Sequence, residues 1–242
     1  TTRLKKIKLN DKSLQDFLGI SKYRSSEIEK KNLVGVTNGL AWTEVGGEIL
    51  SVEVILSIGK GKLTITGKLG EVMRESIQAA TSYVKSKSAS LGINPRDFEN
   101  YDIHIHVPEG STPKDGPSAG IAIFNSLVSS LTNNKIKRDV AMTGEITLRG
   151  EVLQIGGLKE KLLAAHRGGV KMIIIPDENK KDLEKIPNKI LGKLKIVPVK
   201  WIDQVLEAAL VHQPYISDDK KKSQSGPSIE NIKNQEDSIR PH

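Results

Sequence analysis

The stretch Pro-Lys-Asp-Gly-Pro-Ser-Ala-Gly, residues 113–120, marks the point where a loop is expected to become a helix. The residues after it place an apolar stripe at spacings of three and four, formed by Ile121, Phe124, Val128 and Leu131. Pro117 suits the first helical turn, because the N–H that proline lacks has no helical partner there. The pattern predicts that Ser118 lies beside free backbone donors and the positive end of a helix dipole.

This position of Ser118 is compatible with two roles. A helix start stabilises an oxyanion that develops beside the serine oxygen, as a nucleophile requires. The backbone N–H groups of Ser118 and Ala119 are the candidate donors. Gly116 and Gly120 would let a substrate backbone approach closely, or would simply serve the turn. Many serines at helix starts only cap the helix, so the position alone leaves both roles open.

Lys161 lies in a second helical pattern, Gly-Gly-Leu-Lys-Glu-Lys-Leu-Leu-Ala-Ala-His-Arg-Gly-Gly, residues 156–169. The glycine pairs at both ends predict a short helix between them. Lys161 falls inside the apolar arc of this helix, which consists of Leu158, Leu162, Ala164 and Ala165. Such a lysine either extends its amine to solvent or is buried. Burial would lower its pKa, and the neutral amine could then accept a proton from a serine hydroxyl.

Three stretches of the sequence resemble one protease family. They are residues 113–120, Met-Thr-Gly-Glu-Ile-Thr-Leu-Arg-Gly at 142–150 and Ile-Gly-Gly-Leu-Lys-Glu-Lys at 155–161. In this order they resemble the proteolytic domain of Lon, the ATP-dependent protease, and the resemblance covers about residues 33–212. It implies that Ser118 is the nucleophile and Lys161 the general base of a Ser–Lys dyad. It also implies that Thr143 hydrogen-bonds and orients the lysine, whereas the local pattern alone describes only a threonine at a strand end.

The order of strands and helices lacks a regular βαβ alternation, which favours the α+β class. The resemblance implies a fold similar to ribosomal protein S5 domain 2, with residues 33–212 as the protease domain. Residues 1–32 resemble the end of the AAA+ small helical subdomain and its linker, with Leu14, Phe17 and Leu18 in one short helix. Residues 213–242 are polar and are expected to form a disordered tail.

Local patterns predict the elements of the protease region. Strands are expected over 37–58, followed by a hairpin turn at Lys60-Gly61-Lys62 into a strand at 63–66. A helix over 71–91 is expected to present Val72, Ile77, Ala80 and Val84 to the core. The remaining expected elements are a strand at 103–107, a strand pair over 140–152 broken at Gly144, a buried strand at 171–175, an edge strand at 196–199 and a helix at 202–210.

The resemblance also implies what the complete protein does. It would be a cytoplasmic, ATP-dependent serine endopeptidase that degrades misfolded and short-lived regulatory proteins. Unfolded or tagged proteins would be its substrates, and the assembly would be a homo-oligomeric ring, a hexamer. ATP and Mg²⁺ would belong to an AAA+ ATPase part, because no P-loop pattern occurs in this sequence. No cofactor or metal is expected to bind this chain itself.

The composition excludes several classes of function. The absence of cysteine excludes disulfides, a thiol nucleophile and Cys-ligated zinc, and fits a reducing cytosol. No apolar run is long enough to cross a membrane. The formal charge of +8 arises mostly in residues 1–31, where nine Lys and Arg residues accompany four Asp and Glu residues. Aromatic residues make up only 4% of the chain, which argues against base-stacking surfaces and nucleic-acid binding.

Acidic residues near the motifs leave alternatives open. Asp115, three residues before Ser118, either pairs with Lys161 and holds it charged and inactive, or caps the helix. Glu145 and Arg149 would form inter-subunit or structural ion pairs.

His104 and His106 alternate onto one face of their strand. They could form a solvated or structural pair. They could also be two metal ligands, although no third ligand is near in sequence, or one of them could be the base of a Ser-His-Asp arrangement. Two other functions also remain possible. One is a catalytically silent Lon-like module for assembly or nucleic-acid binding, which would lack the dyad, and the other is a hydrolase of small amides or esters.

Overall fold

The computed structural model describes residues 10, 17, 28–43, 46–108 and 114–212. The helix expected within residues 1–31 and the tail expected at 213–242 therefore lie almost entirely outside the described residues.

A seven-stranded sheet forms the centre of the described part, with strand order β3-β4-β2-β1-β5-β8-β9. Four of its neighbouring strand pairs are parallel, and β1–β2 and β2–β4 are antiparallel. A separate antiparallel pair joins β6 and β7. The strands are β1 Val36–Thr43, β2 Gly46–Ile58, β3 Leu63–Thr66, β4 Tyr101–His106, β5 Val140–Met142, β6 Glu145–Ile146, β7 Val152–Leu153, β8 Met172–Pro176 and β9 Lys195–Val199. The expected mixture of helices and strands is confirmed, around a mostly parallel sheet.

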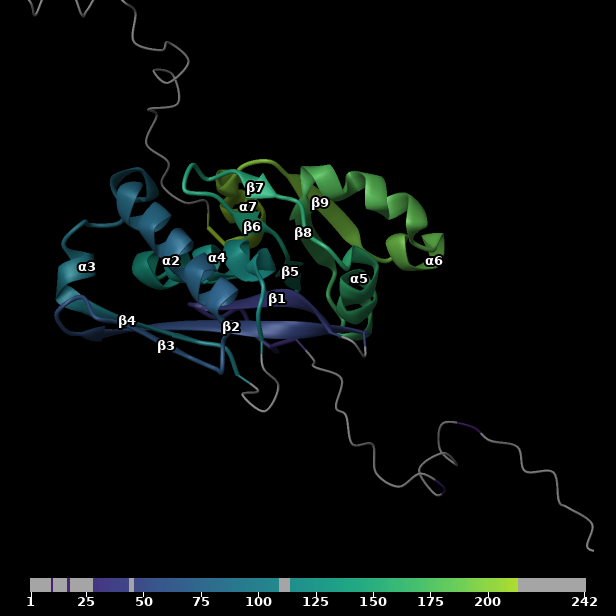
Figure 1. Ribbon diagram of the computed structural model, residues 1–242, viewed down its shortest axis with the longest axis horizontal. Helices are drawn as coiled ribbons and strands as arrows, with labels where there is room; N and C mark the ends of the chain where they lie inside the picture. Colours follow the sequence, from purple (N-terminus) through teal and green to yellow (C-terminus); the bar gives the residue numbers. More distant parts are fainter. Residues whose placement is uncertain (1–9, 11–16, 18–27, 44–45, 109–113, 213–242) are drawn as a thin grey trace, which may run out of the picture.

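Helices pack against both faces of this sheet. They are α2 Glu71–Ser86, α3 Asp97–Asn100, α4 Gly120–Thr132, α5 Leu158–Arg167, α6 Asn188–Leu191 and α7 Ile202–Ala209, with short 3-10 helices η1 Ala89–Leu91, η2 Pro117–Ala119 and η3 Asp177–Lys185. Figure 1 shows α2 and α4 over the β1–β4 part of the sheet. Along β8, Ile174 joins the core around α4, while Ile173 and Ile175 join a second core that includes Leu158 and Leu162 of α5. Because neighbouring strand residues point to opposite faces, α4 and α5 cover opposite faces of this part of the sheet.

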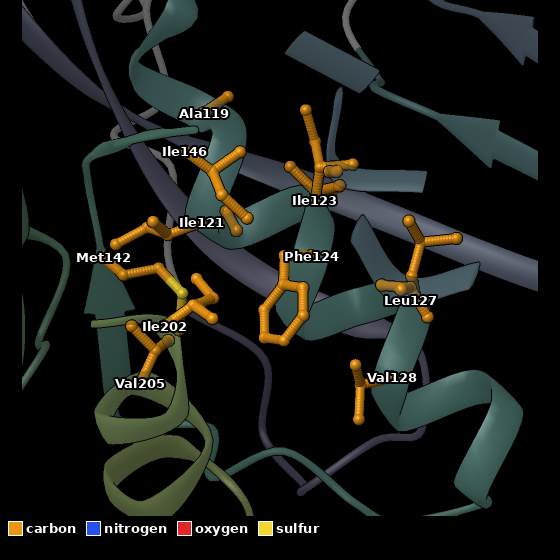
Figure 2. Packing of buried hydrophobic residues seen from close by; sticks show 14 of the residues in the cluster. Ala119, Ile121, Ile123, Phe124, Leu127, Val128, Met142, Ile146, Ile202 and Val205 are labelled. Carbon is orange, nitrogen blue, oxygen red and sulfur yellow. The ribbon is translucent and has the colours of Figure 1, made fainter. Parts of the chain in front are cut away.

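The helix α4 is the centre of the larger core. Every residue from Gly120 to Ser129 is buried, and the ring of Phe124 meets the ring of Tyr83 edge to face at 5.7 Å between centroids. Figure 2 shows side chains of α4 converging with Met142 of β5, Ile146 of β6, and Ile202 and Val205 of α7. The apolar stripe predicted after Ser118 is confirmed, and its burial anchors the helix start that carries this serine.

Three local predictions are wrong in part. The turn at 60–62 does not form a hairpin between β2 and β3, because β4 lies between these strands. Asp102 of β4 accepts hydrogen bonds from the backbone N–H groups of Lys60 and Lys62, each 2.8 Å long, and so holds the turn against β4. In the next helix, Val72 is 42% exposed and Met73 is buried in its place. This helix ends at Ser86, five residues before the predicted end.

The remaining strands and helices agree more closely with the sequence. β8 is buried, β9 with Pro198 lies at the sheet edge, and α5 and α7 begin and end within a residue or two of the expected positions. In the expected pair at 140–152, β5 instead joins the main sheet, and only β6 and β7 pair with each other. None of the described helices has the length and apolar character needed to span a membrane.

Candidate active site

Ser118 occupies the short helix η2, between a loop and α4. Gly116 precedes it with φ of +120°, a conformation that residues with a side chain rarely adopt. The carbonyl of Ser118 accepts a hydrogen bond from the N–H of Gly144 at 2.8 Å, and the carbonyl of Gly144 accepts one from the N–H of Ile121 at 3.2 Å. The backbone from Ser118 to Ile121 is thus fixed to the segment that follows β5.

The side chain of Lys161 is buried, so the second of its two predicted orientations is the one adopted. Only 2% of this residue is exposed, and Nζ donates a hydrogen bond to Oγ1 of Thr143 at 3.0 Å. Burial lowers the pKa of Lys161 to about 8, because the charged ammonium loses its hydration. About one-tenth of the amine is therefore neutral at pH 7, and the neutral fraction rises toward pH 8.

Thr143 links the lysine to the serine segment. Its hydroxyl accepts the hydrogen bond from Lys161 and donates one to the carbonyl oxygen of Ser118 at 3.3 Å. Because the single hydroxyl proton of Thr143 is directed to Ser118, it leaves the lone pair of a neutral Lys161 amine free. The hydrogen bonds of the described residues include none between Ser118 Oγ and Lys161 Nζ, so the two groups are connected here through Thr143. Catalytic hydrogen bonds are often long before a substrate is bound.

A pocket of about 300 Å³ lies beside Ser118. The apolar residues that line it are Leu40, Ala41, Trp42, Leu50, Met73 and Ala119, and the others include Thr43, Glu48, Lys114, Asp115 and Gly116. The sequence did not indicate this pocket, because its walls come from β1, β2 and the start of α2. No spacing pattern connects these segments to the serine motif. A mainly apolar recess beside a nucleophile can accept an apolar side chain of a peptide.

Comparison with known proteins agrees with this geometry. The family described as the Lon protease (S16) C-terminal proteolytic domain matches residues 8–212. The chain belongs to this family. It is 59% identical over 212 residues to the Lon protease of Erwinia amylovora, covering 88% of this chain and 27% of that protein. It is 59% identical over 211 residues to the Lon protease of Escherichia coli strain K12, covering 87% and 27%, respectively.

A third relative, the Lon protease of Brucella abortus biovar 1, is 56% identical over 213 residues, which cover 88% of this chain and 26% of that protein. The chain therefore spans about a quarter of the length of the curated Lon proteases it matches. The resemblance to the Lon proteolytic domain that the three motifs indicated is confirmed.

In this Lon proteolytic domain Asp115 binds the backbone of a neighbouring helix. Its Oδ1 accepts hydrogen bonds from the N–H of Met73 at 3.0 Å and from that of Gly116 at 2.9 Å. Met73 lies in the first turn of α2, so Asp115 caps α2 rather than the helix that follows Ser118. The ion pairs among described residues include none between Asp115 and Lys161. The expected pairing in which Asp115 holds Lys161 charged and inactive is therefore not formed in this structure.

Gly120, unlike Gly116, has no room for a substrate backbone. A Cβ at Gly120 would lie 2.9 Å from Cγ2 of Ile146 and 3.0 Å from Oγ of Ser76, so this glycine serves close packing of α4. At Gly116, a Cβ would meet no atom within 4 Å, and the residue lines the pocket.

No hydrogen bond or ion pair among the described residues joins the side chains of the other polar candidates to Ser118 or Lys161. Arg149 pairs with Glu151 at 3.3 Å, and Glu145 lies opposite Leu153 in the β6–β7 pair. His104 and His106 both hydrogen-bond Oγ1 of Thr66, at 2.9 Å and 2.7 Å. They alternate with the buried Ile103 and Ile105, so they face away from the core beneath α4. Among the described residues no cluster of three His, Asp or Glu side chains is placed to hold a metal.

Proposed function

We propose that this chain is the proteolytic part of an ATP-dependent serine endopeptidase, with Ser118 as nucleophile and Lys161 as general base. The observation that carries the proposal is the buried amine of Lys161. It is held by Thr143, whose hydroxyl also binds the carbonyl of the nucleophile residue. Lys161 is 2% exposed and has no carboxylate partner among the residues that the structure describes. Such a lysine is costly for a fold to retain, and such perturbed groups gather at functional sites.

The proposed reaction is peptide-bond hydrolysis through an acyl-enzyme. Neutral Lys161 takes the proton from Oγ of Ser118, and the oxygen attacks the scissile carbonyl. Backbone N–H groups near Ser118 and Ala119 stabilise the oxyanion; loss of one such donor typically costs about 100-fold to 1,000-fold in rate. The protonated lysine then gives its proton to the leaving amine. A water molecule, deprotonated by the same lysine, releases the acyl group.

The wider assembly is also part of this proposal. We place the fold with ribosomal protein S5 domain 2, residues 33–212 as the protease, residues 1–32 as the end of an AAA+ helical subdomain and residues 213–242 as a tail. The active form is a homo-oligomeric ring, a hexamer, in the cytoplasm. The AAA+ part uses ATP and Mg²⁺ to deliver unfolded or tagged proteins. Nucleic acid and membranes are not partners of this chain.

A degradation assay tests the proposal. Unfolded casein and a short chromogenic ester are offered to this chain alone and to the full-length protein with its ATPase part, and the size of each assembly is measured in parallel. We expect ATP-dependent casein degradation by the full-length ring. Ester cleavage without any casein cleavage would identify a small-molecule hydrolase. Inactivity toward both substrates by a folded, assembled protein would identify a silent module.

The histidine alternative gives a separate prediction. His104→Ala removes one of two histidines that share Thr66, on the sheet face away from α4. We expect kcat/KM on a fluorogenic peptide to stay within about threefold of wild type, since this half-buried histidine makes no hydrogen bond to Ser118 or Lys161 among the described residues and substitutions away from a site have small effects on it. A folded but inactive His104→Ala protein would instead assign the base to this histidine.

A further inference from the structure

The side chain of Asn179, in η3, hydrogen-bonds both backbone groups of Ile155, as the backbone of a neighbouring strand would do. This residue is 1% exposed. Its Oδ1 accepts a hydrogen bond from the N–H of Ile155 at 3.0 Å, and its Nδ2 donates to the carbonyl of Ile155 at 2.9 Å. Nδ2 also donates to Oδ2 of Asp182 at 2.8 Å. One buried amide thus satisfies both backbone groups of Ile155, and Asp182 holds that amide in place.

Ile155 lies three residues before Leu158, where the helix that carries Lys161 begins. Gly157 caps the start of this helix with φ of +66°, and a Cβ there would lie 2.8 Å from the Trp42 ring, so the segment passes tightly against β1. The carbonyl of Gly157 accepts the hydrogen bond from the N–H of Lys161 at 3.1 Å. A short backbone path therefore runs from the residue that Asn179 binds to the first turn that positions Lys161.

We propose that Asn179 is a positioning residue for Lys161. By fixing the backbone of Ile155, it sets the start of α5 so that the lysine amine stays buried within hydrogen-bond reach of Thr143. Asn179 does not line the pocket beside Ser118, and it acts through α5 alone. This role rests on the proposed function, in which Lys161 is the base. A displacement of a catalytic group by about 1 Å can lower the rate about 100-fold. The position of the start of α5 therefore affects the reaction rate.

The pKa of Lys161 is lowered by burial and not by a neighbouring charge. The elements packed against α5 are β1, β2, η3 and α6. β1 carries no titratable residue, β2 contributes Glu48 and Glu53, α6 contributes Lys189, and η3 carries the alternating charges of residues 177–185. None of these groups contributes to the lowered pKa, so a loosened helix start would raise it by admitting water.

Asn179→Ala tests the proposal in the full-length protein. We expect kcat on a fluorogenic peptide at pH 7.5 to fall about 10-fold to 100-fold with little change in KM. The rising limb of the pH–rate profile should move toward higher pH by about one unit, as more water reaches the amine. The same shift should appear in the titration of Lys161 followed by NMR of ¹³C-lysine, with its signal assigned from Lys161→Met.

Asn134→Ala is the matched control. The amide of Asn134 makes the same two-point contact with a backbone, since Nδ2 donates to the carbonyl of His212 at 2.9 Å and Oδ1 accepts from its N–H at 3.3 Å. This contact lies at the C-terminal end of α4, and we expect the Lys161 titration to remain as in wild type.

Asp182→Ala gives a milder version of the same test if Asn179→Ala does not fold. It removes only the outer partner of Asn179, and we expect a smaller shift in the same direction. An unchanged Lys161 titration in the folded Asn179 variant, or in Asp182→Ala when the former is unfolded, would overturn the proposal. Because NMR reports the amine directly, that result is distinct from a failure of the proposed function, which would leave the wild-type protein without peptidase activity.

Discussion

Ser118→Ala is expected to abolish peptide-bond hydrolysis while leaving the domain folded. The substitution removes the only atom that forms the acyl-enzyme, and loss of the nucleophile in a serine protease typically lowers kcat by about 10⁶-fold. The hydroxyl of Ser118 makes no hydrogen bond among the described residues, and its anchoring contacts with Gly144 and Thr143 use the backbone carbonyl. The free energy of unfolding should therefore change by less than about 0.5 kcal/mol.

The measurement compares turnover of a fluorogenic peptide with urea unfolding of the same protein. Ser90→Ala is a suitable control, because Ser90 is half-buried in the helix η1, outside the pocket beside Ser118, and its hydroxyl bonds only the carbonyl of Lys87 among the described residues. This control should retain wild-type turnover. Residual turnover by Ser118→Ala above about one-tenth of wild type would remove Ser118 from the role of nucleophile.

Lys161→Met is expected to abolish activity and, at neutral pH, to make the domain more stable. The pKa of Lys161 is about 8 in the folded state and near 10.5 in the unfolded state. Below pH 8 the amine is charged in both states, and the folded state bears the cost of the buried charge. That cost is about 3 kcal/mol, at about 1.4 kcal/mol for each pKa unit. Between pH 8 and 10.5 the folded state loses its proton first, so the cost disappears.

Urea unfolding at pH 7 and at pH 10 checks this sign. The gain in the free energy of unfolding from Lys161→Met should be largest at pH 7 and smaller at pH 10. Loss of the hydrogen bond to Thr143 should reduce this gain at both pH values. Lys159→Met, on the exposed side of the same helix, should show no such dependence. If the stability gained by Lys161→Met instead increased with pH, that result would contradict the burial of the charged amine. Wild-type turnover by this variant would contradict the dyad.

The parts of the fold and site that the sequence predicted are those set by local patterns. The apolar arc around Lys161 predicted a choice between burial and solvent, and the stripe after Ser118 predicted the buried helix α4. The choice for Lys161 depended on Thr143, 18 residues earlier, and on β1 and β2, which cover the helix. Periodicity within one helix contains no information on such partners.

Two of the wrong predictions, and the unpredicted role of Asn179, share one physical cause. Asp115 was expected to act on the helix after Ser118 or on Lys161, and instead it binds Met73, 42 residues earlier in the chain. The strand at 63–66 was paired with its neighbour in sequence, although Asp102 draws the intervening turn to β4. Asn179 has no pattern that distinguishes it from any asparagine on a short helix. In each case a side chain satisfies backbone groups that are distant in sequence, and only the folded chain identifies them.

The placement of α4 and α5 on opposite faces of the sheet has a consequence for when the domain can cut. Ser118 lies at the start of α4, which covers one face of the sheet, and Lys161 lies in α5, which covers the other face. Neither layer can assemble the dyad alone, and the strands between them must be paired for the two groups to meet. A chain in which these strands are not paired would therefore lack the proposed dyad, so partly unfolded copies of the domain should not cleave their neighbours.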